Sequence, residues 1–450
     1  MSVSPMRDPP SRSSAEPPTT VRYRVIGVSV AMAFMLYLDR VCLGEIVKDD
    51  SFRADFDVSK ERIGEVLGAF FFTYALFQVP AGWASDRFGA RRMLTSYIVL
   101  WSLMTGITGW ASTVSALLLA RLACGVAQAG AYPTSSGVVR QWFPLHRRGL
   151  ASGWISLGGR LGGTLAPYLT ALLIVALGDW RSVLIGYFIA GLVVAGLYAW
   201  IVRDRPDSHP AVNDGELQSI GPQPDTVRPT AGEFFGMLLA CALNRSLWLN
   251  SLSQFSINIG WAFLITWLPS YLADSQGVAA VTGATMVTLV LASGMPGQLL
   301  GGVLGDRAVS AIGLRWGRVL VPSIALAIAG FAYMTCLTLE SVWLIVTCCA
   351  VVSLMTDIAN PSTWAFMQDV GGRNTAAVFG WANMWGNFGA AFSAMLVPYL
   401  MKWGEASGRG QDLVFIVCGS AFFVASLMML GMDATKPVQP AVVSPQPVDA

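Results

Sequence analysis

Residues 33–46, AFMLYLDRVCLGEI, place an aspartate and an arginine side by side inside an apolar run that extends over residues 24–46. A run of about 20 apolar residues is long enough to cross a bilayer as a helix. An ionised side chain at mid-bilayer costs about 3 to more than 10 kcal/mol, so it persists where it lines a polar cavity or has a partner. The stretch therefore predicts a membrane-spanning helix whose Asp39 and Arg40 belong to a polar site inside the protein.

The composition of the whole chain is typical of a membrane protein. Of 450 residues, 54% are hydrophobic and only 12% are charged, against about 25% charged residues in ordinary soluble domains. The net charge is +2 without a basic cluster, which argues against a nucleic-acid partner. The seven cysteines lie in apolar runs without a Cys-x-x-Cys motif, and the two histidines lie apart. We therefore expect neither a metal site nor a cofactor.

Apolar segments of spanning length recur along the chain in two sets of six. They occupy residues 24–46, 62–84, 93–111, 114–139, 149–177, 182–202, 247–273, 281–304, 317–339, 342–367, 374–401 and 412–432. This hydropathy pattern predicts an all-α membrane protein with 12 transmembrane helices in two six-helix bundles. The predicted domains are a disordered cytoplasmic tail (1–22), the N-terminal bundle (23–202), a cytoplasmic linker with an interfacial helix (203–245), the C-terminal bundle (246–433) and a second disordered cytoplasmic tail (434–450).

Lys and Arg residues are unevenly distributed between the two sides that these spans define. With both termini on one side, 19 of the 29 Lys and Arg residues lie on that side, 7 lie in the opposite loops and 3 lie within the spans. Positive charge collects on the cytoplasmic side of membrane proteins. We therefore expect both termini to be cytoplasmic in a bacterial-type inner (plasma) membrane.

A short motif occurs at the matching place of each set of six spans. Residues 81–87 read AGWASDR and residues 301–307 read GGVLGDR. Two bundles repeated in parallel, with a site between them at mid-membrane, are typical of an alternating-access carrier. The charged residues of these loops are expected to form ion pairs and helix-end contacts in one conformation only, and thus to act as a gate. These residues are Asp86, Arg87, Arg91, Asp306 and Arg307.

Residues 82–92, GWASDRFGARR, resemble the loop signature of the major facilitator superfamily. Several further pieces resemble its anion:cation symporter branch, whose members carry organic anions such as sugar acids. They are YLDR (37–40), YALFQVPAG (74–82), GVAQAGAYP (125–133) with WFP (142–144), GRLGG (159–163), TWLPSY (266–271) and NMWGN (383–387). The resemblance covers residues 22–433 and implies the major facilitator fold and transport of a carboxylate. Branch members with known proton coupling usually carry Glu where this chain has Gln128, and glutamine does not titrate.

Arg40 is the main candidate for binding a substrate carboxylate. Its planar guanidinium can donate two parallel hydrogen bonds to one carboxylate, and it stays charged when desolvated. Tyr37 lies three residues earlier, on the same helix face, and offers a hydroxyl to the same anion. The alternative is a structural ion pair between Arg40 and an acid on another helix.

Further candidate substrate contacts lie in spans two, four, five, ten and eleven. They are Tyr74, Gln128, Arg160, Ser362, Thr363, Trp364, Asn383 and Asn387. Asn383 and Asn387 lie one helical turn apart and form a neutral pair suited to hydroxyl recognition, and the resemblance implies that at least one contacts substrate. Arg160 stands among glycines, which allow close helix approach. It is either a second cation for the substrate or the partner of Asp39.

Asp39 is the expected proton carrier, because Gln128 cannot take up a proton. It lies about 100° round the helix from Arg40, so it faces a neighbouring helix rather than the same point of the cavity. The alternative is a permanently ionised partner for a neighbouring arginine. Arg121 is linked to proton transfer by the resemblance, and a structural bond to backbone carbonyls is its alternative role.

The favoured function is secondary active transport of an organic anion, a sugar acid or other carboxylate, by proton symport in a monomer. A proton-independent uniporter or anion exchanger, a drug or cation exporter of the same fold, and a ligand sensor that does not transport remain alternatives. A cation exporter would need an acid facing the substrate, where this chain has Arg40. We do not expect an enzyme, because the sequence contains neither a nucleotide-binding loop nor a plausible Ser/His/Asp arrangement.

Overall fold

The computed structural model describes residues 17–56, 60–222, 228–406 and 412–438, and in these ranges the regular structure is helical without a strand. The all-α class predicted from hydropathy is therefore confirmed. Parts of both predicted tails, residues 1–16 and 439–450, lie outside the described residues.

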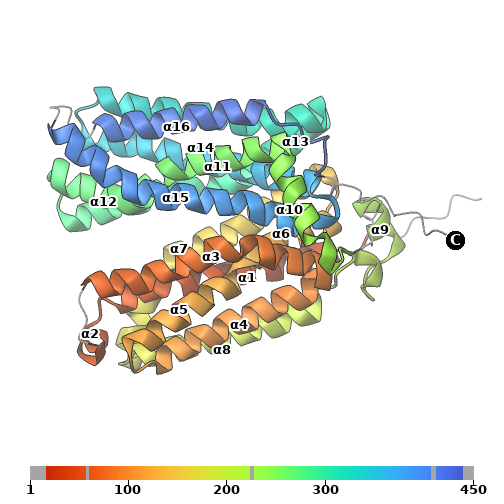
Figure 1. Ribbon diagram of the computed structural model, residues 1–450, viewed down its shortest axis with the longest axis horizontal. Helices are drawn as coiled ribbons and strands as arrows, with labels where there is room; N and C mark the ends of the chain where they lie inside the picture. Colours follow the sequence, from red (N-terminus) through yellow and green to blue (C-terminus); the bar gives the residue numbers. More distant parts are fainter. Residues whose placement is uncertain (1–16, 57–59, 223–227, 407–411, 439–450) are drawn as a thin grey trace, which may run out of the picture.

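The first half of the chain folds as one group of helices, coloured red to yellow in Figure 1. It contains α1 (Val21–Ile46), α2 (Asp50–Phe56), α3 (Lys60–Phe88), α4 (Ala90–Trp110), α5 (Val114–Ala129), α6 (Ala131–Trp142), α7 (Arg148–Leu177) and α8 (Trp180–Ile201). Helix α1 packs on α7 and α8, while α3 and α4 pack on α5. Helices α5 and α6 follow each other with a break at Gly130, where a Cβ would meet the ring of Tyr97 at 2.2 Å.

The second half forms the other group, and α9 (Asp214–Ile220) and α10 (Phe234–Leu243) lie between the two groups in sequence. The second group contains α11 (Arg245–Ala262), α12 (Leu268–Ser270), α13 (Ala280–Thr335), α14 (Val342–Val370), α15 (Thr375–Ala406) and α16 (Asp412–Leu430). Helix α13 is not a single rod, because Gly313 has φ 83° and ψ 170° and breaks the helical path. Glycine tolerates this left-handed φ without the penalty that a Cβ would bring.

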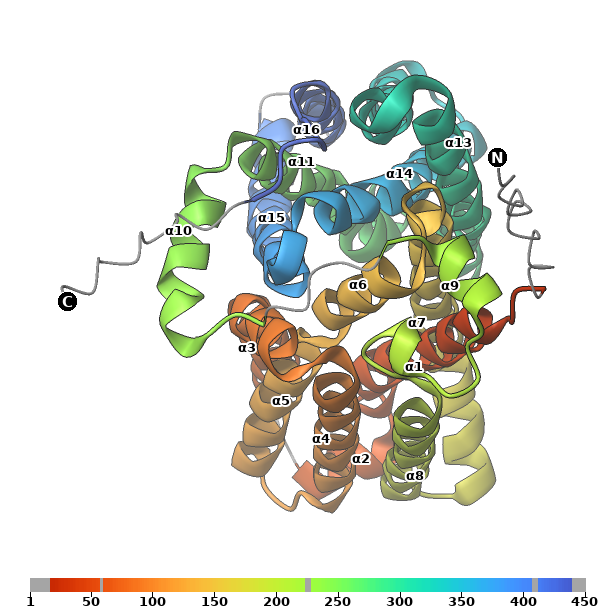
Figure 2. The same cartoon turned by 90° about the vertical axis from the view of Figure 1, so that its right-hand side faces the viewer.

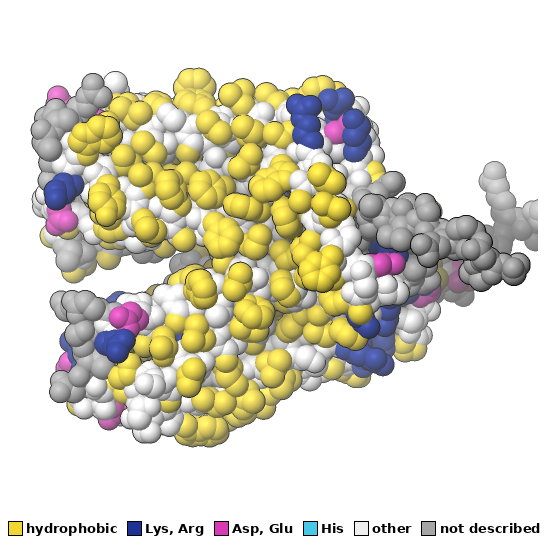
Figure 3. Space-filling model, in the orientation of Figure 1, with side chains coloured by type: hydrophobic (Ala, Val, Ile, Leu, Met, Phe, Trp, Pro, Cys, Tyr) yellow, Lys and Arg dark blue, Asp and Glu magenta, His cyan; other side chains and the backbone are white. Residues whose placement is uncertain are grey.

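The two halves face each other along α3, α6 and α7 on one side and α13, α14 and α15 on the other. Figure 2 shows them as two clusters, with α9 and α10 lying across one end. Figure 3 shows hydrophobic side chains over the flanks and Lys and Arg side chains near the ends. Within the described ranges, eight helical stretches are long and apolar enough to cross a membrane, and one of them, Val281–Thr338, includes the break at Gly313.

A cleft separates the halves at the end of the molecule away from α9, whereas the halves meet at the other end (Figure 3). We call these the open end and the closed end. The opening leads toward the middle of the molecule, where both halves contribute polar side chains to one cavity.

Residues 17–22 and 434–438 differ from their predicted disorder. Helix α1 begins at Val21, and the buried Glu216 of α9 accepts hydrogen bonds from the backbone N–H groups of Val21 (3.2 Å) and Arg22 (3.0 Å). The first N–H groups of a helix have no partner within it, so a carboxylate satisfies them. At the other terminus, the N–H of Val438 donates to the carbonyl of Val370 at 2.7 Å. Composition does not reveal such pairings between distant segments.

Candidate functional site

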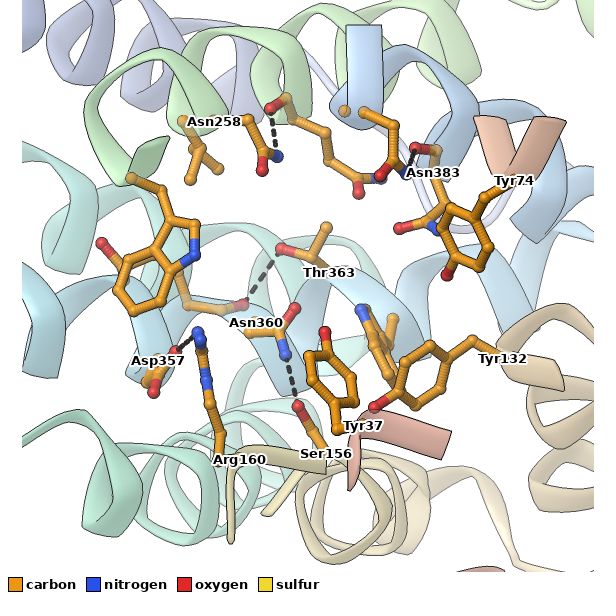
Figure 4. Close-up of a pocket in the computed structure, with 18 of the residues that line it drawn as sticks. Tyr37, Tyr74, Tyr132, Ser156, Arg160, Asn258, Asp357, Asn360, Thr363 and Asn383 are labelled. Atoms are coloured by element: carbon orange, nitrogen blue, oxygen red, sulfur yellow. Dashed lines mark hydrogen bonds and ion pairs between the residues drawn. The ribbon is translucent and has the colours of Figure 1, made fainter. Parts of the chain in front are cut away.

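The two halves enclose a cavity of about 170 Å³ between them. Its walls come from α1, α3, α6 and α7 of the first half and from α11, α14 and α15 of the second (Figure 4). Its polar and aromatic lining residues are Tyr37, Arg40, Tyr74, Tyr132, Ser156, Arg160, Gln254, Asn258, Trp261, Thr356, Asp357, Asn360, Thr363, Trp364, Asn383 and Asn387. A small polar solute bound there would contact both halves at once.

Arg40 enters the cavity from α1 between aromatic rings. Its guanidinium carbon lies 4.3 Å from the ring centroid of Tyr74, 4.7 Å from that of Tyr37 and 5.1 Å from that of Phe70. Such stacking holds the guanidinium plane by cation–π attraction. No acid forms an ion pair with Arg40 in the part of the chain that the structure describes. The guanidinium thus brings an uncompensated positive charge to the cavity.

Gln128 lies behind Arg40 and is buried. Its Oε1 accepts from both Nε and Nη2 of Arg40, each at 3.3 Å, and its Nε2 donates to the carbonyl of Leu36 at 3.3 Å. A neutral amide therefore orients the arginine without cancelling its charge. The Nη1 and Nη2 edge of the guanidinium keeps donors for an anion.

Arg160 of α7 forms an ion pair across the interface between the halves. Its Nη2 lies 2.5 Å from Oδ1 of Asp357 on α14, and its guanidinium carbon lies 4.0 Å from the ring centroid of Trp261. The predicted alternative, a pair with Asp39, is not what the structure has. Sequence could not identify Asp357 as the partner, because the two residues are 197 positions apart and belong to different halves.

Amide side chains fill much of the remaining cavity wall. Asn383 of α15 donates to Oε1 of Gln78 on α3 at 2.5 Å, and Asn387 donates to the carbonyl of Asn383 at 2.7 Å. On α14, Asn360 donates to Oγ of Ser156 at 3.0 Å and to Oε1 of Gln298 at 3.1 Å. Groups of this kind both donate and accept hydrogen bonds, which suits a solute that carries hydroxyls.

Eight of the ten predicted substrate contacts line this cavity. They are Tyr37, Arg40, Tyr74, Arg160, Thr363, Trp364, Asn383 and Asn387. Gln128 contacts Arg40 instead of the cavity. Ser362 is turned away and packs against Gly305 of α13, where a Cβ would meet its Oγ at 2.1 Å. Adjacent helical residues point about 100° apart, so the direction of Thr363 and Trp364 into the cavity leaves Ser362 pointing toward α13.

Several lining residues were not among the predicted contacts. They are Tyr132, Ser156, Gln254, Asn258, Trp261, Thr356, Asp357 and Asn360. A helical signal for two of them was present, since Gln254 and Asn258 are four residues apart in an apolar span and one turn of helix brings them together. The carbonyl of Gln254 accepts from the Asn258 amide at 2.8 Å.

Asp39 and Arg121, the predicted proton-coupling residues, lie inside the first half rather than on the cavity wall. Asp39 is 1% exposed, and neither of its carboxylate oxygens has a hydrogen-bond partner among the described residues. Trp101 of α4 and Arg121 of α5 face it. Arg121 also donates from Nη2 to the carbonyl of Arg40 at 3.4 Å. The two residues thus form a buried polar layer directly behind the cavity arginine.

Two of the five predicted gate residues join the halves at the closed end. Asp86 of α3 accepts from the N–H groups of Ala376 (3.0 Å) and Ala377 (2.9 Å) at the start of α15. Asp306 of α13 accepts from those of Gly149 (3.0 Å) and Leu150 (2.8 Å) at the start of α7. Each carboxylate thus caps a helix of the opposite half.

The other three predicted gate residues do not make such contacts. Arg91 bonds within its own half and the segment after it, through its N–H to Asp204 and through Nε to the carbonyl of Ala199, both at 2.8 Å. Arg87 lies over the rings of Trp83 and Phe88 of its own helix. Arg307 is exposed on α13.

Relatives of this chain are described as transporters of organic anions. A probable sulfoacetate transporter SauU of Cupriavidus necator is 31% identical over 91% of this chain and 93% of its own length. A probable galactarate/D-glucarate transporter GudP of Bacillus subtilis is 26% identical over 92% of each chain. The D-galactonate transporter of Escherichia coli O6:H1 is 26% identical over 94% of this chain and 98% of its own.

Solved structures and a family model agree on the fold. The proton:xylose symporter XylE has a TM-score of 0.69 at 17% identity, over 93% of this chain and 98% of its own. The model of the Major Facilitator Superfamily matches residues 30–394, most of the chain. This match, together with the relatives, makes the protein a transporter rather than an enzyme. The chain belongs to the Major Facilitator Superfamily.

Proposed function

We propose that this protein is a secondary active transporter of an organic anion, a sugar acid or a similar carboxylate, that works by alternating access of its two halves. The observation that carries the proposal is Arg40, which faces a cavity between the halves without an acid partner among the described residues. A partly desolvated guanidinium that is not neutralised by the protein binds carboxylates strongly. The relatives named above, which are described as carriers of such anions, support the same substrate class.

The proposal includes the number of membrane crossings and their orientation. We expect twelve crossings in two six-helix bundles, 23–202 and 246–433, with α5 and α6 as one crossing and α13 as two. Both termini are then cytoplasmic in the plasma membrane, and the protein acts as a monomer. In this arrangement the open end faces outward, so the structure corresponds to a state that receives substrate from outside.

Proton symport is the favoured energetics, with Asp39 as the proton carrier and Arg121 beside it. The buried carboxylate of Asp39 lies one residue from Arg40, so its charge can influence anion binding over a short distance. Proton-independent uniport or exchange is the second candidate, because Gln128, which bonds to Arg40 directly, cannot titrate. Alkalinisation of a weakly buffered exterior on adding substrate supports symport, whereas an unchanged exterior pH supports the second candidate.

Replacement of Arg40 by lysine tests the proposed function. We expect Arg40→Lys to reduce D-galactonate uptake and binding at least tenfold, because an ammonium cannot reproduce the bidentate geometry and loses the stacking on Tyr37 and Tyr74. Binding is measured as thermal stabilisation of the purified protein, which reaches about 2.7 kcal/mol when the ligand is at 100 times its dissociation constant. Arg92→Lys, at an exposed arginine of α4, is the matched control. Normal uptake and binding by Arg40→Lys would remove Arg40 from the substrate site.

A further inference from the structure

Three charged side chains line the cavity in the described ranges: Arg40, Arg160 and Asp357. Arg160 and Asp357 form an ion pair at 2.5 Å, with 24% and 0% of their side chains exposed. Their charges cancel. The cavity wall therefore carries one uncompensated positive charge, and that charge belongs to Arg40.

Asp357 is held in place by the helix behind it. The Cα of Gly294 on α13 lies so close that a Cβ there would be 2.5 Å from Oδ2 of Asp357, and a Cβ at Gly297 would lie 3.1 Å from its Cβ. On the cavity side, the Trp261 ring covers Arg160 at 4.0 Å. The pair is thus confined between α7, α11, α13 and α14, which leaves the carboxylate no room to swing away from a bound solute.

Neutral groups surround this pair. Asn360, one turn along α14 from Asp357, bonds to Ser156 and Gln298. In Figure 4 the pair lies at one side of the cavity, whereas Tyr74, which stacks on Arg40, lies at the other. One side of the cavity thus holds an unpaired cation among aromatic rings. The other holds a neutralised ion pair among amide and hydroxyl groups.

We propose that Asp357 makes the cavity selective for monoanions, which place their single carboxylate at Arg40 and a neutral, hydroxyl-bearing remainder beside the Arg160–Asp357 pair. This inference rests on the proposed function and narrows its substrate class. A solute with a second carboxylate or sulfonate would bring that charge beside the Arg160–Asp357 pair, where it loses water and finds no uncompensated cation. Arg160 cannot offset this cost fully, because its charge is already shared with Asp357.

D-Galactonate and galactarate are the matched probes. They share the same carbon chain and hydroxyls and differ at one end, a CH₂OH group in the monoanion and a carboxylate in the dianion. At pH 7, where both are fully ionised, we expect the wild-type protein to bind galactonate at least tenfold more tightly than galactarate. The quantity of interest is this ratio of dissociation constants, because general damage to the site changes both constants equally and leaves their ratio unchanged.

Replacements of the two partners should move the ratio in opposite directions. Asp357→Asn frees the charge of Arg160, so the preference for galactonate should fall at least tenfold or invert. Arg160→Gln leaves the charge of Asp357 without its partner, so the preference should increase even though both acids bind more weakly. Glu65→Gln, which removes an acid of α3 that is 55% exposed and outside the cavity lining, is the control and should not change the ratio.

The double variant Arg160→Gln/Asp357→Asn leaves no charge unpaired. Its ratio should stay close to that of the wild type, because this side of the cavity has no net charge in either protein. Arg160→Gln provides the test if Asp357→Asn leaves too little folded protein. A wild-type protein that binds galactarate as tightly as galactonate, while Arg40→Lys loses both, overturns the monoanion selectivity and leaves the proposed function standing. A ratio that stays the same in Asp357→Asn or in Arg160→Gln also overturns it. Wild-type binding of both acids that survives Arg40→Lys contradicts the proposed function itself.

Discussion

At the scale of single residues, Gln128 determines how much positive charge Arg40 offers to a solute. The amide accepts from two guanidinium nitrogens of Arg40 and anchors itself on the carbonyl of Leu36. An ionised glutamate of the same size would form an ion pair with Arg40 and could not donate to that carbonyl. The nature of residue 128 therefore decides whether anion binding at Arg40 depends on the protonation of its neighbour.

Gln128→Glu should make anion affinity depend on pH in a way that the wild type does not. With the glutamate ionised, Arg40 is neutralised, and D-galactonate should bind at least tenfold more weakly than to the wild type at pH 8. Protonation of the glutamate releases Arg40, so the ratio of the two dissociation constants should approach one as pH falls toward 5. Calorimetry on both proteins at matched pH measures this ratio and cancels titrations that they share.

The exposed Gln218 of α9 provides the control, and Gln218→Glu should leave the ratio at one throughout. Should the ratio for Gln128→Glu stay constant between pH 5 and 8, residue 128 does not regulate the charge of Arg40.

Residue-level reasoning from sequence works where one helix decides the answer. Tyr37 and Arg40 were expected on one face from their spacing, and both line the cavity. Ser362 was also a predicted substrate contact, but it points toward α13 and away from the cavity. The ion pair of Arg160 with Asp357 depends on how two halves meet, and no local pattern encodes that geometry. The roles of these residues in transport remain predictions.

At the scale of helices, hydropathy locates apolar segments but not their irregularities. The segment after α11 contains π-helical turns at Phe263–Trp267 and Tyr271–Ser275 around α12. Pro269 lies between them and lacks the N–H that would continue a regular hydrogen-bond ladder. A wider turn accommodates this loss. The breaks at Gly130 and Gly313 likewise depend on backbone conformation, to which a hydropathy average is insensitive.

Glycines at the contacts between the halves allow the helices of the two halves to approach closely. Gly82 of α3 lies against α15, and a Cβ there would be 2.4 Å from the carbonyl oxygen of Ala376. Gly302 occupies the matching place in the second copy of the repeated motif, and a Cβ there would be 2.6 Å from the Cα of Leu150 on α7. We call these two contacts, α3 against α15 and α13 against α7, the seams between the halves. Each seam depends on a glycine, whose lack of a side chain lets the helices approach closely, as in other closely packed membrane helices.

Gly82→Ala should push the halves apart at the closed end. A methyl group 2.4 Å from a backbone oxygen cannot be accommodated by a rotamer change, so α3 and α15 must separate. The distance between spin labels at the exposed Arg92 and Arg315, in a background without native cysteines, should shift to longer values. Gly68→Ala on the same helix has nothing within 4 Å and is the matched control. Equal distance distributions in the two variants would mean that the seam at Gly82 tolerates the methyl group.

At the scale of the whole molecule, the repeated motif closes the protein symmetrically. Asp86 of the first half caps α15 of the second, and Asp306 of the second half caps α7 of the first. The internal repeat in the sequence predicted two comparable halves, and the structure adds that each copy of the motif contacts the opposite half. Sequence alone does not reveal this exchange, because it is a property of the assembled closed end.

The two caps differ in their surroundings, and this difference predicts unequal contributions. Among the described residues of the opposite half, Asp86 accepts hydrogen bonds from the two backbone N–H groups named above. Asp306 also forms an ion pair at 2.9 Å with Arg318, which is fully buried and bonds in turn to Asp369 at 2.8 Å. Loss of an acid from a buried charge network costs more than loss of a cap alone.

Asp86→Asn and Asp306→Asn should therefore both favour the state that opens at the closed end, and Asp306→Asn should do so more strongly. Asparagine keeps one of the two acceptor oxygens, so each variant loses one backbone hydrogen bond, which costs about 1 kcal/mol and changes the equilibrium between the two states about fivefold. Asp86→Asn should change the populations by about that factor, and Asp306→Asn by more, in the same label-to-label distance between positions 92 and 315. The double variant should combine both effects, because the caps lie on separate seams and share no partner.

Asp433→Asn is the matched control for these changes. Asp433 lies just after α16, and its bonds to Ser246, Thr435 and Lys436 stay within the second half. It should leave the distance distribution unchanged while removing the same charge. A larger effect for Asp86→Asn than for Asp306→Asn would mean that Arg318 and Asp369 stabilise the second half internally rather than the closed state. Unchanged populations in both variants would show that the two caps add nothing to the closed state.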